Sequence, residues 1–417
     1  MKYSLLIFAF LAAGCASPSA ETASPPWWKG NLHTHSYWSD GDDYPEMVMD
    51  WYKEQGYHFM ALSDHNILAE GDKWIVPAQK RNGRIALQRY RDRFGEEGVT
   101  WKVEDADTLV RLKTLAEYRP LFEEEGVFLI IQAEEITDGF EQKPVHVNAT
   151  NVQELIAPQG GGSVREVMQN NVDAVLEQRE RTGQPMFPHI NHPNFGWAVT
   201  AEDLIALRGE RFFEVYNGHP LVHNEGDSLR PGTERMWDII LTERLAQGDD
   251  VLYGIAVDDA HNYHAMTSEN ANPGRGWVMV RAAALTPEAL IAAMEAGDFY
   301  GTSGVTLADI QHDASALRLE IEPEAGVTYV TRFIGTRRGY EAGSEPLALE
   351  GDEAAAVTRR YSDDLGVILA EVEGLTPTYT FAGDELYVRA QVISSKRKAN
   401  PYREGEYEVA WTQPVVP

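Results

Sequence analysis

The stretch NLHTHSYWSDG, residues 31–41, holds two histidines separated by one residue, with an acid soon after them. In an extended strand, side chains at positions i and i+2 point to the same side, so His33 and His35 can reach one metal ion. Farther along the chain, Asp259 and His261 repeat this spacing. Because such pairs also occur in solvated loops, the meaning of this one depends on what stands at the ends of the other strands.

Apolar, β-rich runs alternate with amphipathic stretches through the first three quarters of the chain. We expect strands at 30–36, 58–66, 126–137, 144–151, 185–193, 211–220 and 251–261, and helices at 45–57, 107–126, 164–183 and 233–248. This alternation is typical of parallel β/α units. We therefore expect an α/β fold, a closed barrel of seven strands over residues 28–305, with an insertion at 66–105.

The pattern changes at about residue 306. From there to residue 417, short runs alternate with a period of two and are interrupted by Gly, Pro and Asp. This pattern predicts a small C-terminal antiparallel β-sandwich as a separate domain. With 417 residues and 43% hydrophobic content, the chain is long enough for one large domain and one smaller one.

Histidines and acids stand near the ends of the expected strands. In chain order they are His33, His35, His65, Glu134, Glu135, His146, His189, His192, Asp259 and His261. In a closed β/α barrel the carboxyl ends of the strands meet at one mouth. A ring of imidazoles and carboxylates at this mouth can hold several divalent ions, which no single member could do.

These motifs, in this order, resemble those of the polymerase and histidinol phosphatase (PHP) family of metal-dependent phosphoesterases. NLHTHSYWSDG, LSDHN, a Glu before Ile-Thr, a strand His, NHP and DDAH carry the resemblance, which covers about residues 28–305. It implies a distorted seven-stranded barrel with three ions of zinc, manganese or iron. The ligands implied are His33, His35, Glu135 and Asp259 for the first ion, Glu135, His146 and His192 for the second, and Asp40, His65 and His261 for the third.

Two of these assignments leave an alternative open. Glu135 fits the family pattern better than Glu134, because Ile and Thr follow it. His192 fits better than His189, because a proline follows it directly. Both alternatives stay open at the level of the sequence.

The expected activity is hydrolysis of phosphate monoesters or diesters by a hydroxide bridging two ions, with Glu135, Asp259 and His261 as catalytic residues. Loop residues Asn194, Asn217, His219 and His223 are candidates for substrate binding, or else for turns and caps. One alternative is hydrolysis of C–N or C–O bonds, although amidohydrolases usually carry a carboxylated lysine where this chain has an acid. Another is a non-catalytic surface lipoprotein that binds a glycan or a protein partner.

The composition limits the partners and the compartment. A formal net charge of −29 argues against a nucleic-acid partner and favours a small phosphoester captured by metal ions. Residues 1–15 are similar to a lipoprotein signal peptide ending at Cys15, and residues 16–27 predict a flexible tether. We therefore expect an exported protein, lipid-anchored in the periplasm at the outer membrane because Ser17 replaces the Asp of inner-membrane retention. The alternative is a plain secretory peptide with an incidental cysteine.

Overall fold

The computed structural model describes residues 24–347 and 359–417. The expected signal peptide with Cys15 and most of the expected tether lie outside these residues. Within the described ranges, no helix has both the length and the apolar character needed to cross a bilayer.

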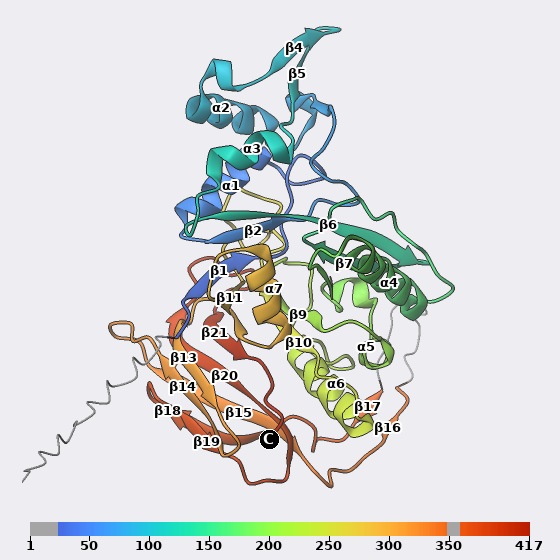
Figure 1. Cartoon of the computed structure of the whole chain (residues 1–417), viewed down its shortest axis with the longest axis vertical. Helices are drawn as coiled ribbons and strands as arrows, with labels where there is room; N and C mark the ends of the chain where they lie inside the picture. Colours follow the sequence, from blue (N-terminus) through green and yellow to red (C-terminus); the bar gives the residue numbers. More distant parts are fainter. Residues whose placement is uncertain (1–23, 348–358) are drawn as a thin grey trace, which may run out of the picture.

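The chain folds into a mixed α/β structure built on one large sheet (Figure 1). Its strands run in the order β10-β9-β8-β7-β6-β2-β1-β11-β12-β21-β20-β15-β18. Residues 27–257 supply seven of these strands, which are β1 (Trp27–Asn31), β2 (Phe59–Leu62), β6 (Leu129–Phe140), β7 (Lys143–Thr150), β8 (Phe187–Ile190), β9 (Phe212–Asn217) and β10 (Tyr253–Val257). Beyond the ends of β1 and β10, Thr34 and Ala260 form a parallel bridge, which brings the first and last of these strands together.

The strand β7 departs from the expected parallel order. β1 pairs with β2, β2 with β6, β8 with β9 and β9 with β10 in parallel, whereas β7 is antiparallel to both β6 and β8. Only two residues separate β6 from β7, and Glu141 takes a left-handed conformation there (φ 55°). A parallel crossover needs a connection of a dozen residues or more, so this tight turn forces a hairpin.

Helices pack against the strands of the large sheet and against one another. They are α1 (Pro45–Glu54), α3 (Leu115–Phe122), α4 (Val164–Thr182), α5 (Ala201–Ala206), α6 (Thr233–Gln247) and α7 (Pro287–Glu295). In α4 the Ser163 side chain accepts a hydrogen bond from the backbone N–H of Glu166, and Gly183 ends the helix at φ 71°. Its buried face, with Val167, Met168, Val172 and Val175 in the core, packs on β7 and β8, and each such side chain contributes about 1.5–3 kcal/mol.

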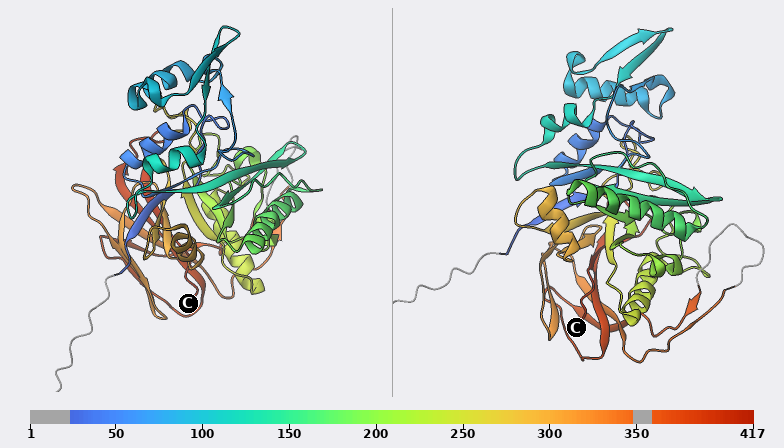
Figure 2. Two further views of the ribbon diagram at one scale, coloured as in Figure 1. Left: turned by 45° about the horizontal axis from the view of Figure 1, so that its top comes forward. Right: turned by 45° about the vertical axis from the view of Figure 1, so that its right-hand side comes forward.

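The insertion after β2 forms a separate layer at the top of Figure 1. It comprises β3 (Trp74–Ile75), the 3₁₀ turns Pro77–Gln79 and Glu96–Gly98, α2 (Gly83–Phe94), β4 (Trp101–Glu104) and β5 (Asp107–Arg111), and the β4–β5 hairpin projects from the body in both views of Figure 2. The prediction of a helix from residue 107 is therefore wrong for its first part. Residues 107–111 pair with β4, and α3 begins only after Thr114, which forms a capping box with Glu117.

The last quarter of the chain extends the large sheet instead of standing apart from it. β11 (Trp277–Arg281), β12 (Phe299–Thr302), β21 (Tyr407–Thr412), β20 (Glu385–Arg397), β15 (Tyr329–Arg337) and β18 (Val367–Glu373) are paired antiparallel in that order. β13 (Leu307–His312), β14 (Ala316–Ile321) and β19 (Thr378–Thr380) form a second, three-stranded sheet, and β16 (Ser344–Glu345) pairs with β17 (Arg360–Tyr361).

A hydrophobic core joins the three-stranded sheet to the adjacent part of the large sheet. Leu317 and Leu319 of the smaller sheet pack in one cluster with Phe333 and Val388 of the larger. Tyr300, from before the expected domain boundary, belongs to the same cluster. Both the sheet and the core continue across residue 305, so neither of them marks a boundary there. The separate sandwich domain at 306–417 stays a prediction.

Candidate metal centre

The backbone just after β1 aligns the first pair of histidines. The N–H of His35 donates to the carbonyl of Ala260 (2.9 Å), and the N–H of Asp259 donates to the carbonyl of His33 (3.0 Å). These two hydrogen bonds fix the HxH segment beside the DxH segment. The ring centroids of His33 and His35 lie 5.2 Å apart, and both side chains are buried.

The loop that follows is folded back over this strand end. Asp64 accepts hydrogen bonds from the N–H groups of Ser36 (2.8 Å) and Ser39 (3.0 Å). A Cβ at Gly41 would lie 2.5 Å from the carbonyl oxygen of His35, so only glycine allows this close approach. The loop thereby carries Asp40 to the open side of the cluster, where 58% of its side chain is exposed.

Glu135 lies at the centre of the candidate cluster. Its Oε2 is 3.2 Å from the Nε2 of both His33 and His35 and 2.9 Å from the Nδ1 of His65. Its Oε1 is 2.8 Å from the Nδ1 of His146 and 3.4 Å from the Nε2 of His192. Burial acts to raise the pKa of Glu135, but the imidazoles around it outweigh burial and hold that pKa well below its usual range.

His146 reaches this centre because of the hairpin. It stands near the beginning of β7, not at its end. Because β7 runs opposite to β6, the beginning of β7 lies at the same end of the sheet as the end of β6. His146 therefore joins the cluster from within its strand, and not from a strand's carboxyl end.

Asp259 lies opposite Glu135 across the first two histidines. Its Oδ1 is 3.2 Å from the Nε2 of both His33 and His35. Asp259 and His192 both adopt positive φ angles (51° and 21°), which are uncommon for residues other than glycine. Such backbone strain is found mainly where surrounding contacts hold a functional side chain in place.

Asp40, His65 and His261 form the solvent side of the cluster. The Oδ1 of Asp40 is 3.5 Å from the Nε2 of His65 and 3.4 Å from the Nε2 of His261. The rings of His65 and His261 stack on His35, with centroids 4.4 and 4.0 Å away. All nine expected ligands are thus brought together, in overlapping groups whose ligand atoms lie within 4.8 Å of one another.

The donor set fits divalent metal ions. The Nε2 of His35 is fully buried, and no hydrogen-bond partner for it exists in the described residues, although two carboxylates lie 3.2 Å away. A buried imidazole nitrogen left without a hydrogen bond between two ionised oxygens is the arrangement expected where a cation would sit.

The structure places the two members of each open pair, Glu134 and Glu135 or His189 and His192, in different surroundings. Glu134 faces away from the cluster, where its Oε1 accepts a hydrogen bond from the N–H of Ile156 (2.6 Å), and burial raises its pKa to about 8. His189 lies deeper than His192 and contacts Glu214 (3.3 Å). The geometry favours Glu135 and His192, whose roles as ligands stay predictions.

Glu214, on β9, is a site residue that the sequence analysis missed. This buried carboxylate contacts the Nδ1 of His33 (2.6 Å) and accepts hydrogen bonds from the N–H of His192 (2.7 Å) and the side-chain amide of Asn217 (2.8 Å). Carboxylates that hold the second ring nitrogen of a metal-binding histidine are a general feature of metal sites. An acid inside the largely apolar strand FFEVYN was the available signal.

The four candidate substrate residues differ in how far the protein already uses them. The amide of Asn194 donates to the carbonyls of His223 (2.9 Å) and Pro231 (3.0 Å), and that of Asn217 donates to Glu214 and Asp259. The ring of His223 stacks on Trp197 at 4.4 Å. These contacts favour a loop-fixing role for the two asparagines. Of the two histidines, only His219 has its ring next to that of a candidate ligand, His261, at 5.5 Å.

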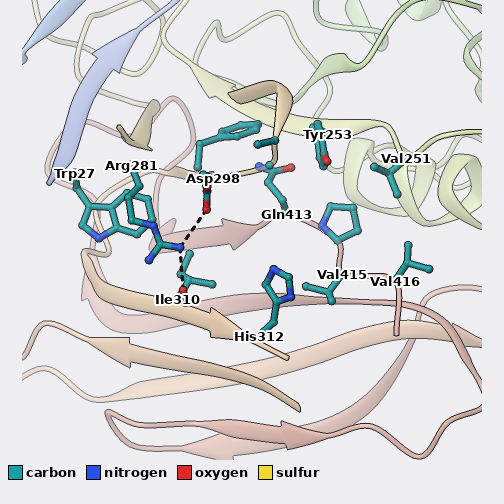
Figure 3. A pocket seen from close by; sticks show the side chains of 14 residues that line it. Trp27, Val251, Tyr253, Arg281, Asp298, Ile310, His312, Gln413, Val415 and Val416 are labelled. Carbon is teal, nitrogen blue, oxygen red and sulfur yellow. Dashed lines mark hydrogen bonds and ion pairs between the residues drawn. The ribbon is translucent and has the colours of Figure 1, made fainter. Parts of the chain in front are cut away.

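A cavity of about 240 Å³ opens at the other end of β10, beside the C-terminal segment (Figure 3). Arg281 on its wall donates to Asp298 (3.2 Å), Asp309 (2.7 Å) and the carbonyl of Ile310 (3.1 Å), so its guanidinium is engaged by the protein. His312 also faces this cavity. Neither residue belongs to a group that could hold a metal within the described part of the chain.

Comparison with known proteins yields weak structural likenesses only. No family model matches the chain, and no curated protein matches it. A two-domain protein from Bacteroides vulgatus that contains a predicted PHP-like metal-dependent phosphoesterase is similar at 13% identity, over 96% of this chain and 100% of that chain, with a TM-score of 0.38.

Two further solved structures match a shorter part of the chain. A protein from Bifidobacterium adolescentis proposed to be a metal-dependent phosphoesterase is 14% identical over 57% of this chain and 89% of its own, with a TM-score of 0.28. An amidohydrolase from Chromobacterium violaceum, with bound sulfate and no metal, is 13% identical over 56% and 87%, with a TM-score of 0.29. Because all three TM-scores lie below 0.5, the case for function rests on the geometry of the site.

Proposed function

We propose that this protein is a metal-dependent hydrolase of phosphate monoesters or diesters. The observation that carries the proposal is the position of Glu135, whose two oxygens lie within 3.4 Å of five imidazoles. A carboxylate so placed can be shared between neighbouring ions. The ions would be held by His33, His35, Glu135 and Asp259, by Glu135, His146 and His192, and by Asp40, His65 and His261.

Divalent ions bound here would polarise an ester oxygen and lower the pKa of water, which supplies a nucleophile near neutral pH. The protein's own residues orient the side chains that would hold these ions. Glu214 and the bridge between Thr34 and Ala260 hold the buried side of the cluster rigid. The exposed Asp40 marks the side open to solvent, from which an ester would enter.

The electrostatics of the chain favour an anionic ester captured at the cluster. With a formal net charge of −29, the chain as a whole repels anions, so a phosphoester needs a concentrated positive centre. Several divalent ions behind a histidine-rich wall would supply that centre. Amidohydrolases usually carry a carboxylated lysine at the bridging position, where this chain is expected to use the acid Glu135. Hydrolysis of phosphate esters is therefore the first candidate, and hydrolysis of C–N or C–O bonds is the second.

A substrate screen tests the proposal. Protein stripped of metal and reloaded with Mn²⁺ or Zn²⁺ is assayed on p-nitrophenyl phosphate, bis(p-nitrophenyl) phosphate, an aryl carboxylic ester and an anilide. We expect hydrolysis of a phosphate ester that is lost on chelation and in the His33→Ala/His35→Ala variant. Turnover of the carboxylic ester or the anilide alone would replace this proposal by the second candidate.

We also propose that β1, β2 and β6–β10 form a distorted barrel, supported by the bridge between Thr34 and Ala260. Export with a lipid on Cys15 is a further proposal, supported by the apolar run before that cysteine. Incorporation of labelled palmitate into the wild type, but not into Cys15→Ser, tests the lipid anchor.

A further inference from the structure

His219 stands on the loop after β9, at the edge of the candidate metal centre. Its ring lies 5.5 Å from that of His261 and 6.2 Å from that of Phe195, edge-on to both. Phe195 in turn packs against His192 (5.1 Å). His219 thus lies beside the candidate ligand His261, and Phe195 separates it from the candidate ligand His192. Within the described residues, no hydrogen bond joins its ring to a carboxylate.

The protein selects one tautomer of this histidine. The backbone N–H of Leu221 donates to the Nδ1 of His219 (3.2 Å), so Nδ1 is an acceptor and the proton of the neutral ring is on Nε2. Within the described residues Nε2 makes no hydrogen bond, and it is not one of the buried polar atoms left without a partner, so it is open to solvent. The ring therefore holds an N–H donor that the protein itself leaves unused.

The backbone of His219 is fixed relative to the cluster. Its N–H donates to the Oδ1 of Asn217 (2.7 Å), and the amide of Asn217 donates to the Oδ2 of Asp259 (3.0 Å). A single buried amide thus connects the candidate ligand Asp259 to the residue that carries the free donor. Donors fixed before the substrate arrives stabilise developing charge without reorganisation.

We propose that the Nε2–H of His219 donates a hydrogen bond to an oxygen of the bound phosphoester, which makes His219 a substrate-contacting residue. This inference rests on the proposed function for the substrate's chemistry. It does not require His219 to bind metal or to change its protonation state. The competing explanation is that the ring serves only its turn, through the contact with Leu221.

Two amide variants separate these explanations. Asn carries its oxygen near the position of Nδ1, so His219→Asn keeps an acceptor for Leu221 and removes the distal donor. Gln extends its amide nitrogen to about the position of Nε2, so His219→Gln restores a distal donor. Bound metal and the thermal unfolding midpoint are measured for both variants, so that misfolding or loss of metal is recognised.

We expect His219→Asn to lower kcat/KM for the ester that the wild type hydrolyses by on the order of 10²-fold, with bound metal unchanged. His219→Gln should recover most of that loss. A His219→Asn enzyme as active as the wild type, or a His219→Gln enzyme as poor as His219→Asn with metal intact, would overturn the proposal. In the metal-free wild type, long-range ¹H–¹⁵N spectra should show the proton on Nε2, and a proton on Nδ1 would also overturn it.

If the wild type hydrolyses no ester, the proposed function fails separately, and affinity decides the role of His219. Inorganic phosphate is then titrated calorimetrically into Mn²⁺-loaded wild type and His219→Asn. At least tenfold weaker binding to the variant supports the donor, and equal affinities overturn it.

Discussion

The Nδ1 of His33 lies 2.6 Å from the Oε1 of Glu214, and both side chains are completely buried. This contact leaves the Nε2 of His33 directed at Glu135 and Asp259, 3.2 Å from each. Burial acts to raise the pKa of Glu214, but His33, His189 and His192 together outweigh burial and lower that pKa to about 2. Glu214 therefore stays ionised and sets the orientation of the first histidine of the cluster.

Replacing Glu214 by Gln should weaken metal binding by about 10- to 100-fold, because the amide holds the ring of His33 less firmly than a carboxylate does. Titration of metal-free protein with Zn²⁺ against a chromophoric chelator measures the affinity. Glu134→Gln is the matched control, since Glu134 is also buried but faces away from the cluster. Equal affinities of Glu214→Gln and the wild type would remove Glu214 from the account.

Asp40 should affect one ion and leave the others in place. It contacts His65 and His261 at the solvent side and takes no part in the groups around Glu135. We expect Asp40→Ala to lose one ion and to lower kcat/KM by on the order of 10²-fold. The metal content and kinetics of Asp40→Ala are compared with those of Asp92→Ala, an exposed acid on α2. Loss of all metal from Asp40→Ala would mean that the three groups do not bind independently.

Lys398 should make the free energy of unfolding depend on pH in the alkaline range. Its side chain is only 6% exposed, its Nζ lies 2.8 Å from the hydroxyl of Tyr216, and burial lowers its pKa from 10.5 to about 8. Between pH 8 and 10.5 the unfolded chain holds the proton that the folded chain has released. Stability from this group therefore rises with pH across that window, by about 3 kcal/mol at most.

Urea unfolding of the wild type and Lys398→Met at pH 7.5, 9 and 10 measures this effect. The free energy of unfolding of the wild type should rise relative to that of the variant as the pH increases. Lys396→Met, which removes a more exposed neighbour that pairs with Glu324, should keep the wild-type slope. Parallel pH profiles for the wild type and Lys398→Met would contradict the lowered pKa.

Much of the candidate site could be predicted because polar residues at strand ends leave a local signature. His33, His35 and Asp259 show it in spacings of two, and the structure brings them together. Glu214 could not be found this way, because its meaning depends on His33, 181 residues earlier in the chain. A carboxylate inside an apolar strand indicates a buried partner without saying which one.

The pairing of strands was harder to predict than their existence. Period-two runs correctly indicated that the last quarter is rich in strands, but a local pattern does not specify which strand pairs with which. β21 pairs with β12, more than a hundred residues earlier, which joins the expected sandwich to the large sheet. In the same way, the two-residue turn after β6, and not the apolar pattern, decides that β7 is antiparallel.

The metal content of the purified protein tests the central claim most directly. After incubation with Mn²⁺ or Zn²⁺ and removal of free metal, plasma mass spectrometry should count about three ions per wild-type chain. Glu135→Gln, which changes the carboxylate nearest to five imidazoles, should retain about one ion or none. A wild type without bound metal, or a Glu135→Gln variant that binds as much as the wild type, would contradict the account.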